Sequence, residues 1–457
     1  MLPETLFRNY DVRGEYGDEL TAEAIYIIAR AYVRFTGVKQ VAIGRDARVS
    51  SPELMQAAVR GLTEEGADVF DVGMVATDVL YFATWHSRYD GSIMITASHM
   101  PKNFNGMKFL RLDNTGDLSP IGRGIGMEEL EDYANRINSA PVAGGGQYQT
   151  IDVWDDYVSF VRSFVNLDAI RPLKVVMDAG NGMGGVVADH VFDGIDIDIT
   201  KLFFTPDGSF PNHDPNPIIP ENRQDIIALV RQRQVDLGIA WDADCDRCYF
   251  IDEKGEFING DFITALLAIQ FLRQYPGAAI VYDLRSTWAV ADWVAKLGGK
   301  GLVERVGHTY IKPAMKKAGA VFGGEMSGHY YFAANKYMDN GFIPALMILE
   351  IISKAGKPLS EIIADLGDYH VSGEINFTVK DVAATLKAVE THYTDAKIDR
   401  LDGLSLSFAD WRCNIRPSAN DPVLRLNVEA KSAGLLKEKV DEISNIIKPC
   451  HLQASIF

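Results

Sequence analysis

The sequence predicts an α/β protein of three or four domains that ends in a smaller α+β domain. Apolar strand-like segments alternate with amphipathic helix-like segments through most of the chain, a pattern typical of layered α/β folds. At 457 residues the chain exceeds the usual size of a single hydrophobic core. After residues 365–368 the pattern becomes rich in strands, which predicts the α+β tail.

The composition is that of an ordinary globular protein, with 47% apolar residues and a net charge of −17. This acidic balance argues against binding to nucleic acid or to an anionic membrane. No apolar run approaches the roughly 20 residues that cross a bilayer. The first residues lack the apolar stretch of a secretory signal, so we expect a cytoplasmic protein. The C-x-x-C of Cys245 and Cys248 lacks the second pair that a zinc site would want.

The first unit is expected to span residues 1–147 and to end at a glycine-rich break. Its predicted elements are helices over 22–37 and 51–65 and strands over 40–44, 68–73 and 93–96. We expect Ser50 or Ser51 to cap the second helix, because short hydroxyl side chains satisfy free N–H groups at helix starts.

The second unit is expected over 148–251, with a helix over 154–164 and a strand over 174–177. The glycine-rich segment 178–185 follows that strand. Its spacing differs from G-x-G-x-x-G, which favours a tight strand-to-helix turn over a dinucleotide site.

The third unit is expected over 252–368 and opens at a hairpin formed by 248–258. A helix over 261–274 and a strand over 279–283 follow. The fourth unit, 369–457, has predicted strands over 371–379, 403–408, 411–416 and 423–430 and predicted helices over 381–391 and 435–447.

The segment 93–109 places a serine and a histidine after an expected strand. Ser98 would leave the end of that strand in a turn with His99, where its hydroxyl can contact a ligand. Lys108 and nearby amide side chains supply donors suited to an anion. An ordinary surface turn is the alternative.

The segment 242–247, DADCDR, places three carboxylates within five residues after another apolar run. Asp242, Asp244 and Asp246 would repel one another without a cation, and carboxylate oxygens favour hard ions such as Mg²⁺. An EF-hand would need glycine where Arg247 stands and helices on both sides. A haloacid-dehalogenase-like phosphatase would usually carry threonine or valine at position 246. These alternatives and a solvated acidic turn stay open beside the favoured metal site.

Two further glycine-bounded loops carry polar groups. Gly307 precedes His308 and gives that histidine a flexible neighbour. Glu325 and Ser327 stand two residues apart in GEMSGH, a pairing that suits contacts with neighbouring sugar hydroxyls. His329, at the end of the same loop, is expected to be structural.

The tail loop RPSAND supplies the guanidinium of Arg416, the hydroxyl of Ser418 and the amide of Asn420. These groups suit a phosphate clamp, and an ordinary polar hairpin turn is the alternative.

Together these residues suggest phosphoryl transfer involving a serine, a hard metal ion and an anionic polyol. A serine hydroxyl is a poor nucleophile at neutral pH, so a metal and cations must stabilise its oxygen and the transferring group. Ser98 with the three aspartates fits that need, with Arg247 or Lys108 on the phosphoryl oxygens. The separation of these segments in sequence predicts a site where domains meet.

Four motifs in order, TASHMP with NGMK, DADCDR, GEMSGH and RPSAND, make the whole chain resemble the α-D-phosphohexomutases. The opening Tyr10-Asp11-Val12-Arg13-Gly14 fits that family as well. The likeness is greatest to its bacterial phosphomannomutase branch, of the type that supplies GDP-mannose.

The resemblance implies three related α/β domains with mixed sheets and a C-terminal α+β domain like the TATA-box-binding protein, arranged around a central cleft. It implies an enzyme phosphorylated on Ser98, with Mg²⁺ held by that residue and the three aspartates. Hexose 1- and 6-phosphates would be the substrates, and a hexose 1,6-bisphosphate would be both intermediate and activator. The oligomeric state stays open.

The resemblance also implies roles for individual residues, with Glu325 and Ser327 on the sugar hydroxyls. The implied catalytic residues are Ser98, Arg13, Lys108, Arg247, His308 and His99. The implied substrate-binding residues are Tyr10, Arg285, Gly307, Glu325, Ser327, Arg416, Ser418 and Asn420.

The GEMSGH loop resembles that of enzymes acting on mannose or glucose phosphates, since phosphoglucosamine mutases typically carry glutamine where Met326 stands. Overall similarity favours mannose phosphates, with glucose phosphates as a second activity. Met100 departs from the family's usual asparagine, and Ala419 and Asn420 depart from its usual tail loop. A mainly phosphoglucomutase activity, a metal-dependent sugar phosphatase and a non-catalytic sugar-phosphate-binding protein are the alternative functions.

Overall fold

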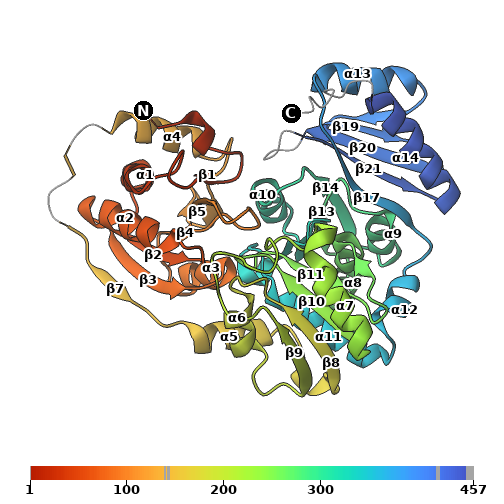
Figure 1. Ribbon diagram of the computed structural model, residues 1–457, viewed down its shortest axis with the longest axis horizontal. Coiled ribbons are helices and arrows are strands. Elements are labelled where there is room, and N and C mark those ends of the chain that lie inside the picture. The colour runs from red at the N-terminus through yellow and green to blue at the C-terminus, as the bar shows by residue number, and fades with distance from the viewer. Residues whose placement is uncertain (1, 138–139, 142–144, 418–422, 449–457) are drawn as a thin grey trace.

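The computed structural model describes residues 2–137, 140–141, 145–417 and 423–448, which form four sheets along the chain (Figure 1). Three mixed sheets with helices precede an antiparallel sheet with two helices, which confirms the predicted fold class. In Figure 1 the first unit lies on the left and the blue fourth unit at the upper right, with the second and third units between them.

The first three units repeat one arrangement: a central strand lies between two parallel neighbours, and a fourth strand returns antiparallel to the third. In the first unit these strands are β2 (Gln40–Arg45), β3 (Asp68–Met74), β4 (Gly91–Ile95) and β5 (Phe104–Leu112). In the second they are β8 (Leu173–Asp178), β9 (Ile197–Leu202), β10 (Leu237–Trp241) and β11 (Cys248–Ile251). In the third they are β13 (Ala279–Asp283), β14 (Lys300–Glu304), β15 (Phe322–Gly324) and β16 (Tyr330–Phe332).

This repetition explains where the polar loops lie. The loop from the third parallel strand to the antiparallel strand holds residues 96–103 in the first unit, 242–247 in the second and 325–329 in the third. Each loop therefore leaves the carboxyl end of a parallel strand, the edge at which open α/β sheets bind ligands.

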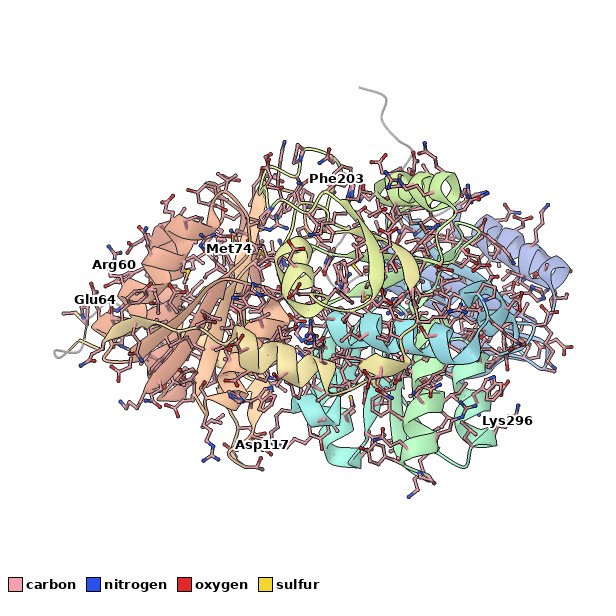
Figure 2. The ribbon with its side chains drawn as sticks, turned by 90° about the horizontal axis from the view of Figure 1, so that it is seen from below. Arg60, Glu64, Met74, Asp117, Phe203 and Lys296 are labelled. Atoms are coloured by element: carbon pink, nitrogen blue, oxygen red, sulfur yellow. The ribbon has the colours of Figure 1, made fainter. Side chains whose placement is uncertain are left out.

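Helices connect and cover these strands. Those of the first unit are α1 (Ala22–Thr36), α2 (Ser51–Glu64), α3 (Thr77–His86) and α4 (Met127–Arg136). Those of the second are α5 (Trp154–Arg162), α6 (Gly184–Val191) and α7 (Gln224–Arg233). Those of the third are α8 (Gly260–Gln274), α9 (Trp288–Lys296), α10 (His308–Ala318), α11 (Phe342–Ala355) and α12 (Leu359–Ala364). In Figure 2, Arg60 and Glu64 of α2 mark the outer end of the first unit, and Lys296 of α9 lies toward the opposite end.

The first unit shows how sequence pattern becomes packing. Apolar residues of α1 recur at helical spacing, and Ile25 and Ile28 are fully buried against Val41 and Ile43 of β2. Thr21 caps α1 by accepting a hydrogen bond from the Ala24 N–H at 3.1 Å.

The expected serine cap of α2 is wrong. Ser50 precedes the helix but its side chain makes no cap hydrogen bond. Its hydroxyl instead accepts from the Asn105 amide at 2.8 Å, and the Ser51 hydroxyl donates to Asp46 at 2.6 Å. The two serines thus join α2 to Asn105 of β5 and to Asp46, which follows β2.

Two of the expected unit boundaries are misplaced, because each separates strands that pair within the same sheet. The first sheet also contains β1 (Val12–Glu15), β6 (Leu118–Pro120) and β7 (Tyr148–Thr150). Because β7 pairs with β3, residues 148–150 lie in the first sheet and not in the second unit. The predicted hairpin at 248–258 is present, but β12 (Phe257–Ile258) pairs with β11 and completes the second sheet instead of opening the third unit. We therefore propose boundaries after Thr150 and after Ile258.

The fourth unit has strands at the predicted places and one short strand that was not predicted. Its antiparallel order is β17 (His370–Phe377), β21 (Leu424–Ala430), β20 (Trp411–Pro417), β19 (Leu404–Ser407) and β18 (Lys397–Asp399), the last being the unpredicted one. Helices α13 (Val382–His392) and α14 (Ala433–Ile447) pack against it, with Val389 and Ile443 fully buried. Among the residues that the structure describes, no helix is both long and apolar enough to span a bilayer.

Asp78 lies where the first three units meet. Its carboxylate accepts hydrogen bonds from the Tyr157 hydroxyl of α5 at 2.8 Å and from the Gly341 N–H before α11 at 3.4 Å. The side chain is fully buried, and burial raises the pKa of Asp78 to about 8. This carboxyl group is therefore protonated in the folded protein over much of the physiological range.

We predict that Asp78→Asn gains thermal stability relative to the wild type as pH rises. The folded-state pKa of Asp78 is raised, so its contribution is complete below the unfolded pKa of about 3.9 and is lost as pH rises through about 8. Between pH 5.5 and 8.5, the Tm of the variant should rise relative to wild type by several degrees in scanning calorimetry. Asp198→Asn, at an exposed position, controls for net charge. A Tm difference independent of pH would contradict the prediction.

Candidate active site

One cavity of about 540 Å³ receives residues from all four units. The loops after β4, β10 and β15 reach it, and so does the β20–β21 hairpin of the fourth unit. The predicted site residues that line it are Tyr10, Arg13, Ser98, His99, Lys108, Asp246, Arg247, Arg285, Gly307, His308, Glu325, Ser327 and Arg416.

Ser98 joins the first unit to the acidic loop of the second. Its hydroxyl donates to Asp242 at 2.9 Å and lies 3.3 Å from Nδ1 of His99. The Ser98 backbone has a φ of 50°, a left-handed conformation that is strained for a residue with a side chain. Such strain persists where surrounding contacts impose it, and here it turns the hydroxyl toward the second unit.

The three aspartates are buried together against one lysine of the first unit. Lys108 donates to Asp244 at 2.6 Å and also to Asp246. Burial opposes the charge on Lys108, but the two carboxylates hold its pKa well above the ordinary value. Burial would raise the pKa of Asp246, but Lys108 and His329 hold it well below its usual range. Burial and the charges of Asp246 and Asp244 raise the pKa of Asp242 well above its usual value.

This acidic cluster fits a hard divalent cation. One carboxylate oxygen from each of Asp242, Asp244 and Asp246 lies within 4.8 Å of the other two. Oδ1 of Asp244 is buried without a hydrogen-bond partner among the described residues, and Oδ1 of Asp246 has only the distant contact of 3.5 Å with His329. Buried oxygens without partners are costly, and an all-oxygen donor set is the one that Mg²⁺ prefers.

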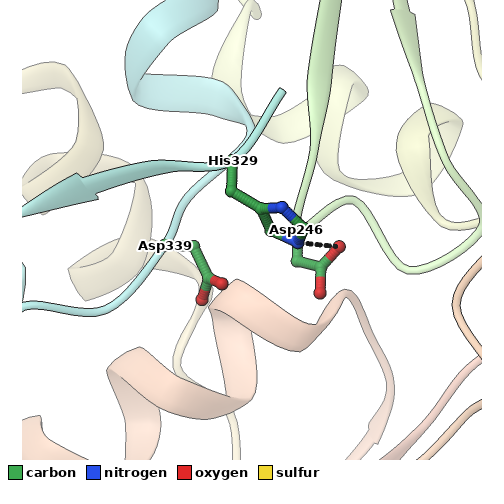
Figure 3. Close-up of side chains that lie close together, drawn as sticks. All are labelled: Asp246, His329 and Asp339. Atoms are coloured by element: carbon green, nitrogen blue, oxygen red, sulfur yellow. Dashed lines mark ion pairs between the residues drawn. The ribbon is translucent and has the colours of Figure 1, made fainter. Parts of the chain in front are cut away.

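Arg247 and His329 extend the polar surface away from this cluster. The Arg247 guanidinium lies 3.7 Å from Asp242, and its Nε lies 3.4 Å from Nε2 of His329. Figure 3 shows the His329 ring turned toward Asp246, with the 3.5 Å ion pair drawn as a dashed line and Asp339 beside them. Asp339 is paired with Lys312 of α10 at 3.0 Å.

Glu325 is held in place by the third unit. The N–H of Gly307 donates to it at 2.9 Å, and the Tyr331 hydroxyl donates to its other oxygen. Gly307 has a φ of 122°, and a Cβ there would lie 2.7 Å from the Tyr10 ring. Only glycine fits this position, so the close approach of Tyr10 depends on it.

The far end of the cavity is rich in arginine. Arg285 makes two hydrogen bonds of 3.0 Å to Asp283, and it lies 3.9 Å from Glu325 and 3.2 Å from Glu374. Glu374 also lies 3.5 Å from Arg416.

Arg416 itself is buried with Nε and one terminal nitrogen lacking a hydrogen-bond partner in the described part of the chain. Burial and the nearby Arg285 charge lower the pKa of Arg416. A buried guanidinium whose nitrogens lack partners can bind an anion through their N–H groups.

Tyr10 and His308 close one side of the cavity. Their rings are 5.6 Å apart, and the Tyr10 hydroxyl donates to the Val306 carbonyl at 3.0 Å. Burial, with Lys312 and Lys108 nearby, lowers the pKa of His308 well below its ordinary value. Arg13, which pairs with Asp11, has Nε and one terminal nitrogen buried without partners among the described residues.

Every predicted site residue that the structure describes lies in or directly beneath this cavity; Asp242 and Asp244 are those beneath it. Ser418 and Asn420, and with them Ala419, lie outside the described residues. His329 is the residue that sequence reasoning missed. It was expected to be structural, although its place two residues after Ser327 on a glycine-bounded loop could have marked it.

The sequence matches four domain families that together cover most of the chain. They are phosphoglucomutase/phosphomannomutase α/β/α domain I over residues 4–121, domain II over 155–255, domain III over 259–369 and the C-terminal domain over 374–446.

Proteins called phosphomannomutase are similar over nearly the full length. One from Salmonella montevideo is 39% identical over 97% of this chain and 99% of its own, and one from Escherichia coli strain K12 is 40% identical over 93% and 95%. A crystal structure of a phosphoglucomutase/phosphomannomutase family protein from Burkholderia thailandensis superposes with a TM-score of 0.88 at 34% identity, covering 98% of each chain. With four matching domains in order around one cavity, the chain belongs to the phosphoglucomutase/phosphomannomutase family.

Proposed function

We propose that the protein is a phosphomannomutase that interconverts mannose 6-phosphate and mannose 1-phosphate, with glucose phosphates as further substrates. The phosphoryl group would be carried by Ser98, and a hexose 1,6-bisphosphate would be both the intermediate and the activator. The observation that carries the proposal is one cavity in which Ser98 touches the acidic cluster while a buried, partly unpaired Arg416 lines the wall.

A continuous series of contacts runs between these two ends. Ser98 contacts Asp242, which lies beside Arg247, and Arg247 contacts His329. His329 lies 3.7 Å from Glu325, and from there Arg285 and Glu374 lead to Arg416. The series has guanidinium groups at one end, the Glu325 carboxylate in the middle and the Ser98 hydroxyl at the other end. A sugar phosphate would match this order, with its phosphate at the guanidinium groups, its ring hydroxyls at the carboxylate and its reacting hydroxyl near Ser98.

Asp242, Asp244, Asp246 and Ser98 would hold Mg²⁺. When bound, this ion supplies Lewis-acid stabilisation of the charge that develops on the phosphoryl oxygens. Lys108 and Arg247 add cationic donors at the same end of the cavity, and Lys108 keeps its proton because two carboxylates surround it.

Proton transfer from the attacking sugar hydroxyl needs a neutral acceptor near the ring. Lys108 and Arg13 were expected candidates together with His308. His308 lines the cavity, its Nδ1 has no partner among the described residues, and burial lowers its pKa so that the ring is neutral. We therefore assign the acceptor role to His308 and keep Lys108 and Arg13 as phosphoryl-binding groups; His99 lies beside Ser98 and orients its hydroxyl.

At the other end Arg416 and Arg285 would grip the phosphate that does not react, with Ser418 and Asn420 on the same loop. Glu325 and Ser327 would hold neighbouring sugar hydroxyls, with Gly307 and Tyr10 shaping the wall. Mannose and glucose differ only at C2, so these contacts favour a shared activity on both sugars. The names of the curated relatives support mannose as the main substrate.

A coupled assay that follows mannose 6-phosphate formed from mannose 1-phosphate, with glucose 1,6-bisphosphate and Mg²⁺ present, tests the proposal. Isomerisation with no matching release of inorganic phosphate is expected. Phosphate release without isomerisation would identify a phosphatase, and binding with neither reaction would identify a sugar-phosphate-binding protein. Running glucose 1-phosphate in parallel tests the sugar preference.

We predict that Ser98→Ala lowers kcat by at least about a thousandfold, because the phosphoryl carrier is lost. Intact-mass analysis should show added phosphate on the wild type after incubation with glucose 1,6-bisphosphate and none on the variant. Ser92→Ala is the matched control, because Ser92 is buried in β4 of the same unit and its hydroxyl has no partner among the described residues. Full activity of Ser98→Ala would refute the assignment.

We predict that Asp244→Asn raises the Mg²⁺ concentration needed for half-maximal activity by at least about tenfold, since it removes one charged ligand. Treatment with a chelator should abolish wild-type activity, and Mg²⁺ should restore it. Asp252→Asn serves as the control, because Asp252 is buried in the next turn of the same unit and outside the cavity. An unchanged Mg²⁺ requirement in Asp244→Asn would count against this ligand set.

We predict that Arg416→Lys raises KM for hexose phosphates by about 10–100-fold, because lysine cannot make the paired hydrogen bonds of a guanidinium. Steady-state kinetics with mannose 1-phosphate measures this change. Arg412→Lys is the control, since Arg412 lies on the same strand but pairs with Glu429. Equal KM values for the two variants would show that Arg416 does not bind the substrate phosphate.

A further inference from the structure

We propose that Arg48 is a positioning residue that fixes the catalytic serine loop by binding four of its carbonyl groups. This inference rests on the proposed function, since it concerns the geometry of Ser98. Arg48 follows β2, has a side chain exposed to 0%, and does not line the cavity. It therefore acts on the Ser98 hydroxyl only through the backbone carbonyl groups of the loop that carries it.

All five N–H donors of the Arg48 guanidinium are used. One terminal nitrogen donates to the carbonyls of Ser98 at 2.6 Å and Met100 at 2.7 Å. The other donates to the carbonyls of Pro101 at 2.7 Å and Phe104 at 3.0 Å. Nε donates to Asp46 at 3.1 Å. Four carbonyls of one turn thus converge on a single planar cation.

This arrangement supplies the contacts that the turn needs. Ser98 has a left-handed backbone, which its own sequence does not favour, so other groups must hold it there. The Ser98 carbonyl is buried, and a buried carbonyl without a donor is costly. The guanidinium supplies that donor, binds the three other carbonyls as well, and ties the turn to the end of β2.

Asp46 completes the support from the other side of Ser98. Its carboxylate accepts from the Arg48 N–H at 3.0 Å and from the Thr96 hydroxyl at 2.8 Å. The Thr96 oxygen in turn accepts from the Ser98 N–H at 2.9 Å. Arg48 therefore holds the carbonyl of Ser98, and Asp46 holds its N–H through Thr96, so the backbone on both sides of the side chain is fixed.

The second unit covers Arg48 as well. The Phe210 ring lies over its guanidinium at 5.1 Å, within the range of a cation–π contact. Phe210 belongs to the segment 203–219, which begins at the Phe203 labelled in Figure 2 and continues into residues that line the cavity. At Gly208 of this segment an added Cβ would lie 2.3 Å from the Ala47 carbonyl, so the segment packs directly on the Arg48 turn.

Lysine cannot replace this arginine. Its ammonium carries three donors on one nitrogen, whereas the turn presents four carbonyls to two separate nitrogens. Arg48→Lys keeps the charge beside Asp46 and should therefore fold, but it should leave part of the turn unbound.

The test compares Arg48→Lys with Arg30→Lys. Arg30 is buried in the same unit and pairs with Glu65 at 2.7 Å, so its variant should carry a similar stability cost without touching the loop. We expect Arg48→Lys to lower kcat by at least about 100-fold, with KM for mannose 1-phosphate within about threefold of wild type, because misplacing a reacting group costs rate more than affinity. A kcat within about threefold of Arg30→Lys would overturn the proposal.

Amide hydrogen exchange gives a readout that does not need activity. The peptide covering residues 98–104 should exchange at least about tenfold faster in Arg48→Lys than in Arg30→Lys, while α1 peptides remain alike. Equal exchange in this peptide would overturn the proposal even if kcat falls. If the wild type shows no mutase activity, the proposed function fails, and the exchange comparison alone decides the role of Arg48.

Asp46→Asn keeps the test decisive if Arg48→Lys does not fold. This change conserves shape but removes the charge that anchors Arg48 and Thr96. We expect the same pattern, a fall in kcat with little change in KM and faster exchange of 98–104. Wild-type kcat together with wild-type exchange in this variant would overturn the proposal.

Discussion

The contact between the first two units depends on three buried carboxylates, which pair with a lysine of the first unit and with an arginine of their own loop. Removing charged groups from water costs several kcal/mol for each ion, and only close partners offset that cost. Lys108 of the first unit provides one such partner, and Arg247 of the second provides another. Three carboxylates share these two side-chain cations; burial and mutual repulsion raise the pKa of Asp242, and a further cation would relieve that repulsion. The same three carboxylates therefore join the first two units and form an acidic cluster that fits a hard cation.

The repeated arrangement of the first three units explains how distant motifs meet. Each unit places its polar loop at the carboxyl end of its third parallel strand, and the units are packed so that these ends face one space. Buried junctions such as that around Asp78, Tyr157 and Gly341 keep the units in this relation. The fourth unit contributes a hairpin in place of such a loop, and it is joined to the third through Glu429, which accepts from the Thr287 hydroxyl and from the Trp288 N–H at the start of α9.

Hydrophobic periodicity was sufficient for the fold class, because it marks helices and strands. The residues proposed for the site lie around one cavity, but Tyr10, Arg13 and Arg285 were named from the family resemblance, whereas Ser98 and the aspartates were named from their chemistry. Pattern failed where tertiary partners decide the outcome. Ser50 and Ser51 read as helix caps, but Asn105 and Asp46 compete for their hydroxyls. The short strand β12 looked like the start of a new unit because sequence does not show which sheet edge it joins.

His329 and Arg48 illustrate the same limit within the site. A single histidine on a polar loop has no distinctive spacing, and its role depends on Arg247 and Asp246, which arrive from another unit. Arg48 occupies an ordinary strand-to-helix connection, and its importance lies in backbone carbonyls, which every residue possesses. A residue that acts by binding main-chain carbonyl groups cannot be recognised from the side chains of the residues that it holds.

The division of the cavity among four separate loops has a consequence for substitutions within it. The backbone of each loop is anchored in its own sheet, so a change in one loop need not unfold another unit. The loops nevertheless touch one another, as His329 does at Arg247 and Asp246, so a substitution at such a contact is felt in two units at once.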